Sequence, residues 1–428
     1  MKDYIKKYIS NIPLWAIVVT ALVIRLAFNI NVFFDESLAM QSDSGSYLQP
    51  AREILGSGGY GSVLRTPGYP LFIALIWLIT PGASIAAVIV SQIIIDSMVP
   101  LLIVRMKGFW QPEDALNRMG AVLYALNPLA IYYSGKIMSE ALFVFWLVLS
   151  FYFFKQFLNA NKTNRWQAVF GTTLAAILTI LTRPVGLWFC LLYFVMMMFI
   201  HRNLKLQFSL IITVVILTAM IWSWRNYEKS GIFTLSTMSN YNLFVFGQIA
   251  YAVDKNLSQR EAQKVFQPAL ETAAQGTNLS WREIPESGQL GKKLILESFG
   301  AAIKTSVIGW IKCAFQPGWG VNQINQMIFS GKYEIEEGGD KTNLSTGSAL
   351  QFPFFQRLWK LPVLGILLWI YGALYLIFLY KTGIDKFRSI KHMSTRLIFG
   401  ICILFFIIIA GPLGFSRFRF PAEVILLI

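Results

Sequence analysis

The chain has 428 residues, of which 55% are hydrophobic and only 14% are charged, and its formal net charge is +15. A soluble domain carries about a quarter charged residues, so this composition excludes an ordinary soluble protein and indicates a membrane protein. The three cysteines are too few for a disulfide framework, and Cys190 and Cys402 lie in apolar runs. We therefore expect no structural disulfide.

Apolar runs of about 20 residues, enough to cross a bilayer, predict an all-α polytopic protein with nine to ten membrane-spanning helices. The first runs from Pro13 to Phe33. The others lie at 84–104, 119–133, 141–158, 167–182, 185–200, 206–224, 362–380 and 397–413. A tenth apolar segment begins at Pro421 and reaches Ile428, so we expect the chain to be truncated or to end in a very short segment.

Basic residues are concentrated in alternate loops. With a cytoplasmic N-terminus, the inner loops hold Lys2, Lys6, Lys7, Arg105, Lys107, Arg118, Lys155, Lys162, Arg165, Arg202, Lys205, Lys381, Lys386, Arg388, Lys391 and Arg396. The positive-inside rule predicts this distribution. Membrane topology therefore accounts for most of the net charge, and we expect no nucleic-acid binding.

This orientation leaves two large segments outside the membrane, 34–83 and 225–360. In the first, "YPLFIALIWLIT" (69–80) is too short to cross and predicts an interfacial helix. In the second, 258–275 and 290–315 have amphipathic helical spacing, and the latter suits a helix lying flat on the membrane. We find no repeat and no separate soluble domain, so residues 1–428 are predicted to form one transmembrane domain.

The first outer segment contains the polar stretch "DSGSYLQPAREILGSGGYGSVLRTPGYP" (43–70). Asp43 and Tyr47 are four residues apart, and Pro50 is tolerated only near the start of a helix. We therefore expect Asp43 in the turn before a helix. Arg65 precedes a rigid Pro-Gly-Tyr-Pro turn that includes Tyr69. On this stretch alone, a solvated loop in which Asp43 caps a helix is an equally good interpretation.

A second polar stretch is "NPLAIYYSGKIMSEALF" (127–143). It places Glu140 at the outer end of a helix, with Lys136 one turn before it. A carboxylate in the first turn also stabilises the helix dipole, so a simple capping role for Glu140 is a comparable alternative.

Arginines recur at the outer ends of the predicted helices. Arg183 lies in "LTRPVGLW", Arg225 and Asn226 in "WSWRNYEKSG", and Arg417 and Arg419 in "GFSRFRFP". Each arginine alone is explained by snorkelling to the interface, but the positive-inside rule gives no reason for arginines in short outer turns. Arginine is well suited to binding phosphate. The group therefore predicts a site for an anionic lipid headgroup such as a lipid phosphate.

Two charges lie deep in the apolar runs, Arg25 in the first and Asp96 in the second. Their similar depth predicts that they pair, either to line a polar path or to lock two helices together, and we favour the lock. No histidine or cysteine pattern indicates a metal. A divalent cation between Asp43 and Glu140 is compatible with their oxygen ligands, but no spacing supports it, so we assign no cofactor.

In their order along the chain, these stretches resemble bacterial glycosyltransferase family 39 and its relatives with the GT-C fold, the dolichyl-phosphate-mannose–protein mannosyltransferase-like and aminoarabinose transferases. The resemblance covers nearly the whole chain. It rests on Asp43–Tyr47, "RTPGYPLF" (65–72), "NPLAIYYSGKIMSEALF", "TRPVGLW", "WRNYEKSGIFTLSTMSNYNLF" (224–244) and "SRFRFP" (416–421).

The resemblance implies a GT-C-like bundle whose active site lies between the first outer loop and the helix mouths. It implies inverting transfer of a sugar from a polyprenyl phosphate to a lipid, glycan or protein acceptor, on the periplasmic face of the bacterial inner membrane. Asp43 would be the general base and Glu140 the second acid. Arg65 falls where relatives have a basic residue. Leu64 stands where aminoarabinose transferases have a glutamate, so a metal site like theirs is not expected.

Two other functions share part of this pattern. A lipid-linked-sugar transporter or flippase needs functional charges near the bilayer midplane, where this chain has only Arg25 and Asp96. A polysaccharide polymerase or ligase would use the same outer arginines and lipid-linked donor, and it is the closest alternative.

Overall fold

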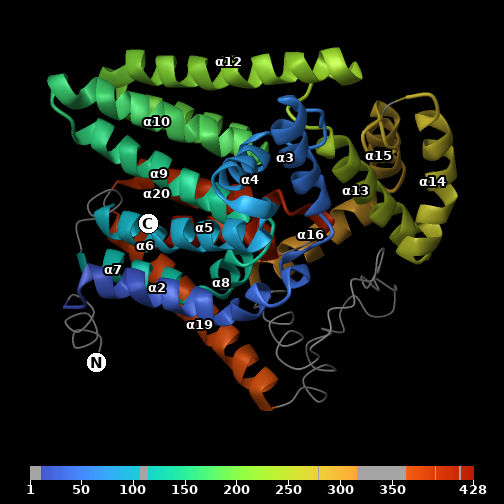
Figure 1. The fold of residues 1–428 in the computed structure, drawn as a ribbon. Helices are drawn as coiled ribbons and strands as arrows, with labels where there is room; N and C mark the ends of the chain where they lie inside the picture. Colours follow the sequence, from blue (N-terminus) through green and yellow to red (C-terminus); the bar gives the residue numbers. More distant parts are fainter. Residues whose placement is uncertain (1–10, 107–113, 278, 316–362, 391, 414–415) are drawn as a thin grey trace.

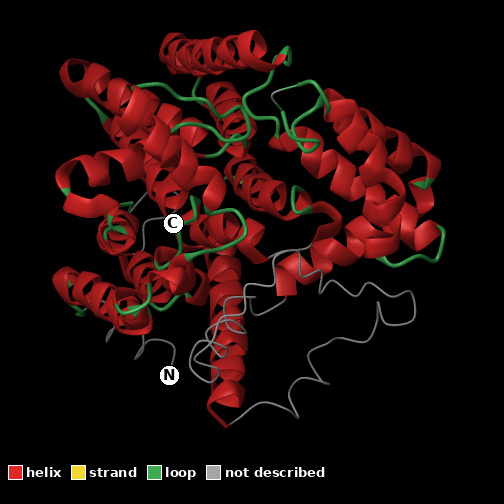
Figure 2. Ribbon diagram, turned by 45° about the vertical axis from the view of Figure 1, so that its right-hand side comes forward, coloured by secondary structure: helices red, strands yellow, loops and turns green. Residues whose placement is uncertain are grey.

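The computed structural model describes residues 11–106, 114–277, 279–315, 363–390, 392–413 and 416–428. Within these residues the chain forms helices and connecting loops without any strand, as Figures 1 and 2 show from two directions. The predicted all-α fold is therefore confirmed for the described part of the chain.

Each apolar run predicted to cross the membrane forms helix. Single helices cover most of them: α2 (Leu14–Phe28), α9 (Glu140–Asn159), α10 (Lys162–Thr182), α11 (Val185–Ile200), α12 (Lys205–Ser230), α19 (Val363–Ser389), α20 (Met393–Ile408) and α21 (Ser416–Leu427). Three described stretches, Ile85–Arg105, Glu140–Asn159 and Arg202–Ser230, are long and apolar enough to cross a membrane by length and composition. These features fit a helical membrane protein.

Prolines break two of the runs. The run 84–104 divides into α5 (Ile85–Ser97) and α6 (Val99–Arg105), and the run 119–133 divides into α7 (Asp114–Ala125) and α8 (Pro128–Ser134). A proline has no N–H to donate, so it fits the first turn of a new helix. Asn127 caps α8, because its side-chain oxygen accepts hydrogen bonds from the N–H groups of Leu129 (2.8 Å) and Ala130 (3.1 Å).

Five of the long helices form a row of neighbours, in the order α12, α10, α9, α5 and α2 (Figure 1). Because α9 and α10 are consecutive and antiparallel, the start of α9 and the end of α10 lie at the same end of this row. The helices α3 (Gly45–Ser57) and α4 (Gly68–Ile79) pack against each other there. The row therefore brings the first outer segment onto the mouths of α9 and α10.

Gly68 explains how α4 reaches this position. A Cβ atom on Gly68 would lie 2.6 Å from the carbonyl oxygen of Leu181, near the end of α10. Only glycine lets the two backbones approach so closely. The helix expected over 69–80 is confirmed, and the turn that carries Tyr69 is consequently held beside Arg183.

The second outer segment forms α13 (Met238–Asp254), α14 (Gln259–Ala274), α15 (Pro285–Glu297) and α16 (Phe299–Phe315). The first three gather to one side of the row in Figure 1 around a small hydrophobic cluster that includes Phe244, Leu270 and Ile284. This cluster is separate from the main core, although the sequence shows no separate domain.

The prediction of one helix over 290–315 is wrong, because α15 and α16 meet at a bend of 100° beside Ser298. Each helix docks through a glycine on a different partner. A Cβ on Gly291 would lie 2.4 Å from the backbone of Leu243, and one on Gly309 would lie 2.0 Å from the carbonyl oxygen of Gly411. Two close contacts in different directions require a break that helical periodicity does not reveal.

Candidate active site

The first acid–arginine pair joins the turn before α3 to the loop after it. Asp43 sits in the turn before α3, as expected, and its Oδ1 lies 2.9 Å from Nη2 of Arg65. The other arginine nitrogens donate to Ser46 Oγ (2.9 Å) and Tyr47 Oη (3.2 Å). The Asp43 and Arg65 side chains are 28% and 13% exposed. A small molecule can therefore reach the Asp43 carboxylate.

The second pair connects the start of α9 with the end of α10. Nη1 of Arg183 lies 2.6 Å from Oε1 of Glu140, in the first turn of α9, and the two side chains are 20% and 3% exposed. The residue before Glu140, Ser139, has its hydroxyl 3.2 Å from Tyr47 Oη. Because Arg65 donates to the Tyr47 oxygen, the Tyr47 hydroxyl hydrogen is available for Ser139. This contact joins the two acid–arginine pairs.

Tyr69 and Lys136 are buried residues beside these two pairs. The Tyr69 ring packs edge-on against Tyr47 at 5.0 Å, and its hydroxyl donates to Oε1 of Gln92 at 2.9 Å. The Lys136 ammonium donates to the carbonyl oxygen of Leu38 at 2.5 Å, and the whole residue is buried. Burial lowers the pKa of Lys136 to about 7, because a charged amine is poorly solvated there. Lys136 therefore tethers the segment before Asp43.

Arg225 holds the loop that leads to Arg65. Its guanidinium donates to the carbonyl oxygens of Tyr60 and Ser62, the latter at 2.8 Å, and lies over the rings of Tyr60 and Trp222. Tyr60 in turn donates its hydroxyl to the carbonyl oxygen of Arg65 at 2.8 Å. The structure thus gives this arginine partners within the protein, in the loop beside the candidate site.

Asn226 fixes the connection after α12. Its Nδ2 donates to the carbonyl oxygens of Thr234 (2.8 Å) and Leu235 (3.1 Å). The adjoining Ser236 donates its hydroxyl to the carbonyl oxygen of Leu64 at 2.5 Å. Asn226 therefore affects the site indirectly, because it fixes the backbone of the segment that supports the Arg65 loop.

Two of the predicted arginines, Arg417 and Arg419, lie near the C-terminal end of the chain. The side chain of Arg417 lies outside the described residues. Arg419 is buried and pairs with Glu423 at 2.5 Å, and its Nη1 donates to the carbonyl oxygen of Cys313 at 2.7 Å. The other carboxylate oxygen of Glu423 accepts from Asn127 at 2.7 Å. The structure therefore places Arg419 in a buried network of its own.

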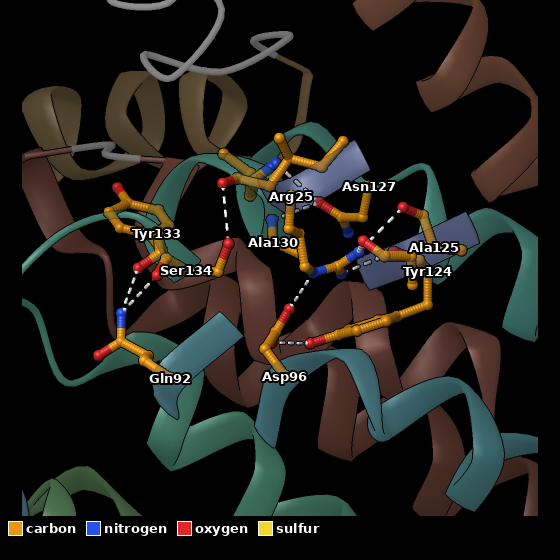
Figure 3. Close-up of polar contacts among 12 residues, drawn as sticks. Arg25, Gln92, Asp96, Tyr124, Ala125, Asn127, Ala130, Tyr133 and Ser134 are labelled. Atoms are coloured by element: carbon orange, nitrogen blue, oxygen red, sulfur yellow. Dashed lines mark hydrogen bonds and ion pairs between the residues drawn. The ribbon is translucent and has the colours of Figure 1, made fainter. Parts of the chain in front are cut away.

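The predicted pair of Arg25 and Asp96 is confirmed, with Nε 2.6 Å from Oδ2 and both side chains fully buried (Figure 3). The hydroxyl of Tyr124 donates to the other Asp96 oxygen at 2.5 Å. The remaining arginine nitrogens donate to the carbonyl oxygens of Ala21 and Ala125, both at 3.1 Å, and of Tyr124 at 3.3 Å. Both Asp96 oxygens and all three guanidinium nitrogens of Arg25 have hydrogen-bond partners. The pair therefore fits a structural link between α2, α5 and α7.

In the described part of the chain, no group of three or more His, Cys, Asp or Glu side chains is arranged to hold a metal ion. Asp43 and Glu140 each pair with an arginine instead. Oε2 of Glu140 is buried and has no hydrogen-bond partner among the described residues. An unpaired buried carboxylate oxygen is costly, so it marks a place where a donor group would be accepted.

The sequence did not single out Ser139, Gln92 or Tyr60. Ser139 precedes an acidic residue at a predicted helix start, and Gln92 is a polar residue that follows Ser91 in an apolar run. Both are signals that sequence reasoning can use. Tyr60 lies in a glycine-rich bend, where nothing local indicates its partners.

Comparison of the chain with protein-family models gives no match, and comparison with curated protein sequences also gives none. The functional interpretation therefore depends on the residues and their geometry.

Proposed function

We propose that the chain is a GT-C-like membrane glycosyltransferase of nine to ten membrane-spanning helices, with its N-terminus in the cytoplasm of a bacterial cell and its active site at the periplasmic face of the inner membrane. It moves a sugar, with inversion, from a polyprenyl phosphate to an acceptor hydroxyl. Asp43 is the general base, and Glu140 with Arg183 forms the second half of the site.

One observation carries the proposal. Asp43 and Arg65 are connected through Tyr47 and Ser139 to Glu140, which binds Arg183. These residues come from three distant stretches of sequence and meet at one end of the helical row. A scaffold without activity gives no reason for such a meeting.

The position of α12 supports an active site at the membrane surface. Large apolar side chains along α12 are exposed, from Leu206 (72%) to Trp224 (59%). The distance between these residues is about 27 Å at 1.5 Å per residue, close to the thickness of a bilayer's hydrocarbon core. Trp224 and Tyr227, which mark the interface in membrane proteins, flank Arg225. This end of α12 holds the Arg65 loop, so the site lies at interface depth.

The chemistry matches the available groups. Asp43 is exposed enough to take a proton from an acceptor hydroxyl, as a general base must. The leaving phosphate gains negative charge, which a positioned arginine stabilises. Arg183 makes its one ion pair among the described residues through Nη1 and is 20% exposed, so the rest of its planar guanidinium is suited to that role.

The transporter interpretation lacks support at the bilayer midplane. Arg25 and Asp96 are fully buried and bind each other, Tyr124 and backbone carbonyls. An ion or substrate path requires groups that can exchange partners. The polymerase interpretation differs from the proposal only in the product, which the assay below resolves.

The test uses the purified protein in liposomes, with a panel of sugar-loaded polyprenyl phosphates and a mixture of lipid, glycan and peptide acceptors. We expect release of polyprenyl phosphate and one added sugar per acceptor, and its loss in Asp43→Asn. Asp35→Asn is the matched control, because Asp35 lies in the same segment and its carboxylate accepts from the N–H and hydroxyl of Ser37 alone among the described residues. Full activity of Asp43→Asn removes the proposed base, and products of increasing length favour a polymerase.

A further inference from the structure

One buried side chain, that of Gln92, connects the two acid–arginine pairs of the candidate site. Gln92 lies in α5 and is 1% exposed. Burying an amide in this position is costly unless each of its polar atoms has a partner.

The Gln92 amide meets this requirement with four contacts. Its Nε2 shares its two hydrogens among the carbonyl oxygens of Tyr133 (2.8 Å), Ser134 (3.0 Å) and Lys136 (2.8 Å), and the first two contacts are drawn in Figure 3. Its Oε1 accepts from the Tyr69 hydroxyl at 2.9 Å. A neutral amide provides donors and an acceptor at one place, and neither a carboxylate nor an apolar side chain can replace both.

The acceptor side of Gln92 leads to the first acid–arginine pair. Tyr69, which Gln92 holds, packs edge-on against Tyr47 at 5.0 Å. Tyr47 accepts a hydrogen bond from Arg65, the partner of Asp43. The rotation of the Tyr69 ring therefore affects where Tyr47 and Arg65 can lie.

The donor side of Gln92 leads to the second pair. Two of the carbonyls that it binds belong to the last residues of α8, Tyr133 and Ser134, and the third belongs to Lys136 in the turn before α9. This turn continues through Ser139 into Glu140. The turn makes a close approach to α2, since a Cβ on Gly135 would lie 1.7 Å from Oδ1 of Asn29. Gln92 binds the backbone on both sides of this glycine.

We infer that Gln92 is a positioning residue that sets the separation between the Asp43–Arg65 and Glu140–Arg183 pairs. This inference rests on the proposed function, since the pairs matter as a unit only if both act on one substrate. Gln92 acts through Tyr69 and the α8–α9 turn. Its role depends on its hydrogen bonds, so side-chain volume alone cannot supply it.

The experiment compares Gln92→Met and Gln92→Glu with the wild-type protein in detergent and in liposomes. Gln248→Met is the matched control, because Gln248 is also buried (3% exposed) and also donates to a backbone carbonyl, in the separate α13–α15 cluster. Two readouts are measured: amide hydrogen exchange of peptides covering 133–139 and 66–73 without substrate, and kcat and KM for sugar transfer.

For Gln92→Met we expect exchange of the 133–139 peptide to rise roughly tenfold or more, because the amide's hydrogen bonds to the carbonyls of this segment are lost. We expect kcat to fall about a hundredfold through misplaced groups, with KM within about threefold of wild type. Gln248→Met should change neither. The inference is overturned if exchange in 133–139 is unchanged. It is also overturned if the loss of kcat is no larger than the loss of folded protein in the Gln92→Met sample.

Gln92→Glu keeps the test decisive if Gln92→Met fails to fold. An ionised carboxylate repels the three carbonyls, whereas its protonated form donates to one of them. Exchange of 133–139, taken relative to wild type at the same pH, should therefore decrease as the pH falls, and a flat ratio contradicts the inference. If the wild-type protein transfers no sugar, the proposed function fails, and the exchange readout still decides whether Gln92 holds the turn.

Discussion

Arginine–carboxylate pairs occur in two different settings in this molecule. Arg25 and Asp96 are completely buried, 2.6 Å apart, and surrounded by further hydrogen bonds from Tyr124 and to backbone carbonyls. Asp43 and Arg65, at the end of the helical row, are 2.9 Å apart and remain 28% and 13% exposed. The same chemical pair is sealed in one region and accessible in the other.

The difference shows how a structural ion pair is distinguished from a candidate functional one. A buried pair is tolerated only when every donor and acceptor is satisfied, and Arg25 with Asp96 meets this condition. At the candidate site, Oε2 of Glu140 is left without a described partner, and Asp43 can be reached from outside. Incomplete satisfaction and access are typical of sites that bind a ligand.

The largest effect on stability is expected at the fully buried pair of Arg25 and Asp96. Asp96→Asn leaves the Arg25 charge buried without its counter-ion, so we expect a loss of about 3–5 kcal/mol, measured by thermal and denaturant unfolding in detergent. Asp43→Asn should cost less than about 1 kcal/mol, as exposed pairs do. Arg25→Met combined with Asp96→Leu should recover most of the loss. Equal destabilisation by the two single changes contradicts the comparison.

The second effect is on catalysis at the accessible region. Glu140→Gln removes the charge that faces Arg183, and we expect kcat/KM for sugar transfer to fall about a hundredfold or more, with a smaller stability change than in Asp96→Asn. The control is Glu36→Gln, since Glu36 lies in the same outer region and accepts only from the N–H of Ala86 among its described contacts. Normal transfer by Glu140→Gln would exclude Glu140 from the mechanism.

The third effect is a pH dependence caused by Lys136. Its pKa in the folded protein is about 7, whereas an unfolded lysine titrates near 10.4. Between these values the unfolded state binds more protons, so stability should increase with pH by up to about 1.4 kcal/mol per pH unit. Lys136→Met should lower the slope by the share of Lys136 and leave that of buried Lys386, whose pKa is also lowered by burial to about 7. Lys293→Met, at an exposed lysine, should leave the slope intact. Melting curves from pH 7 to 10 test the slope, and an unchanged slope in Lys136→Met refutes the assignment.

The smallest effect concerns the hydrogen bond that joins the two pairs. A double-mutant cycle of Tyr47→Phe and Ser139→Ala should give a coupling of about 1 kcal/mol in stability. Replacing Ser139→Ala by Ser150→Ala, farther along α9, should give a coupling near zero. A coupling near zero in both cycles means that the two pairs are independent.

Part of the site could be predicted because alternating loops have a fixed side. Once the alternate basic loops are assigned to one end of the helices, Asp43, Arg65, Glu140 and Arg183 are expected near the opposite end, and the structure brings them together. The carbonyl partners of Arg225 and Arg419 could not be predicted in this way. A carbonyl that becomes available through a loop or a helix end leaves no local pattern in sequence, unlike the partner of Arg419 four residues along the same helix, Glu423.

The sequence by itself determined the class of protein, the positions of the apolar helices and the pairing of Arg25 with Asp96. Apolar length and periodicity favour helices, and a charge within an apolar run requires a counter-charge because isolated burial is too costly. Only the tertiary structure decided where α15 turns away from α16 and which arginine pairs with which acid. It also decided that Gln92 supports both acid–arginine pairs of the candidate site. These features depend on contacts between backbones that are distant along the chain, where glycines such as Gly68 and Gly291 allow helices to touch.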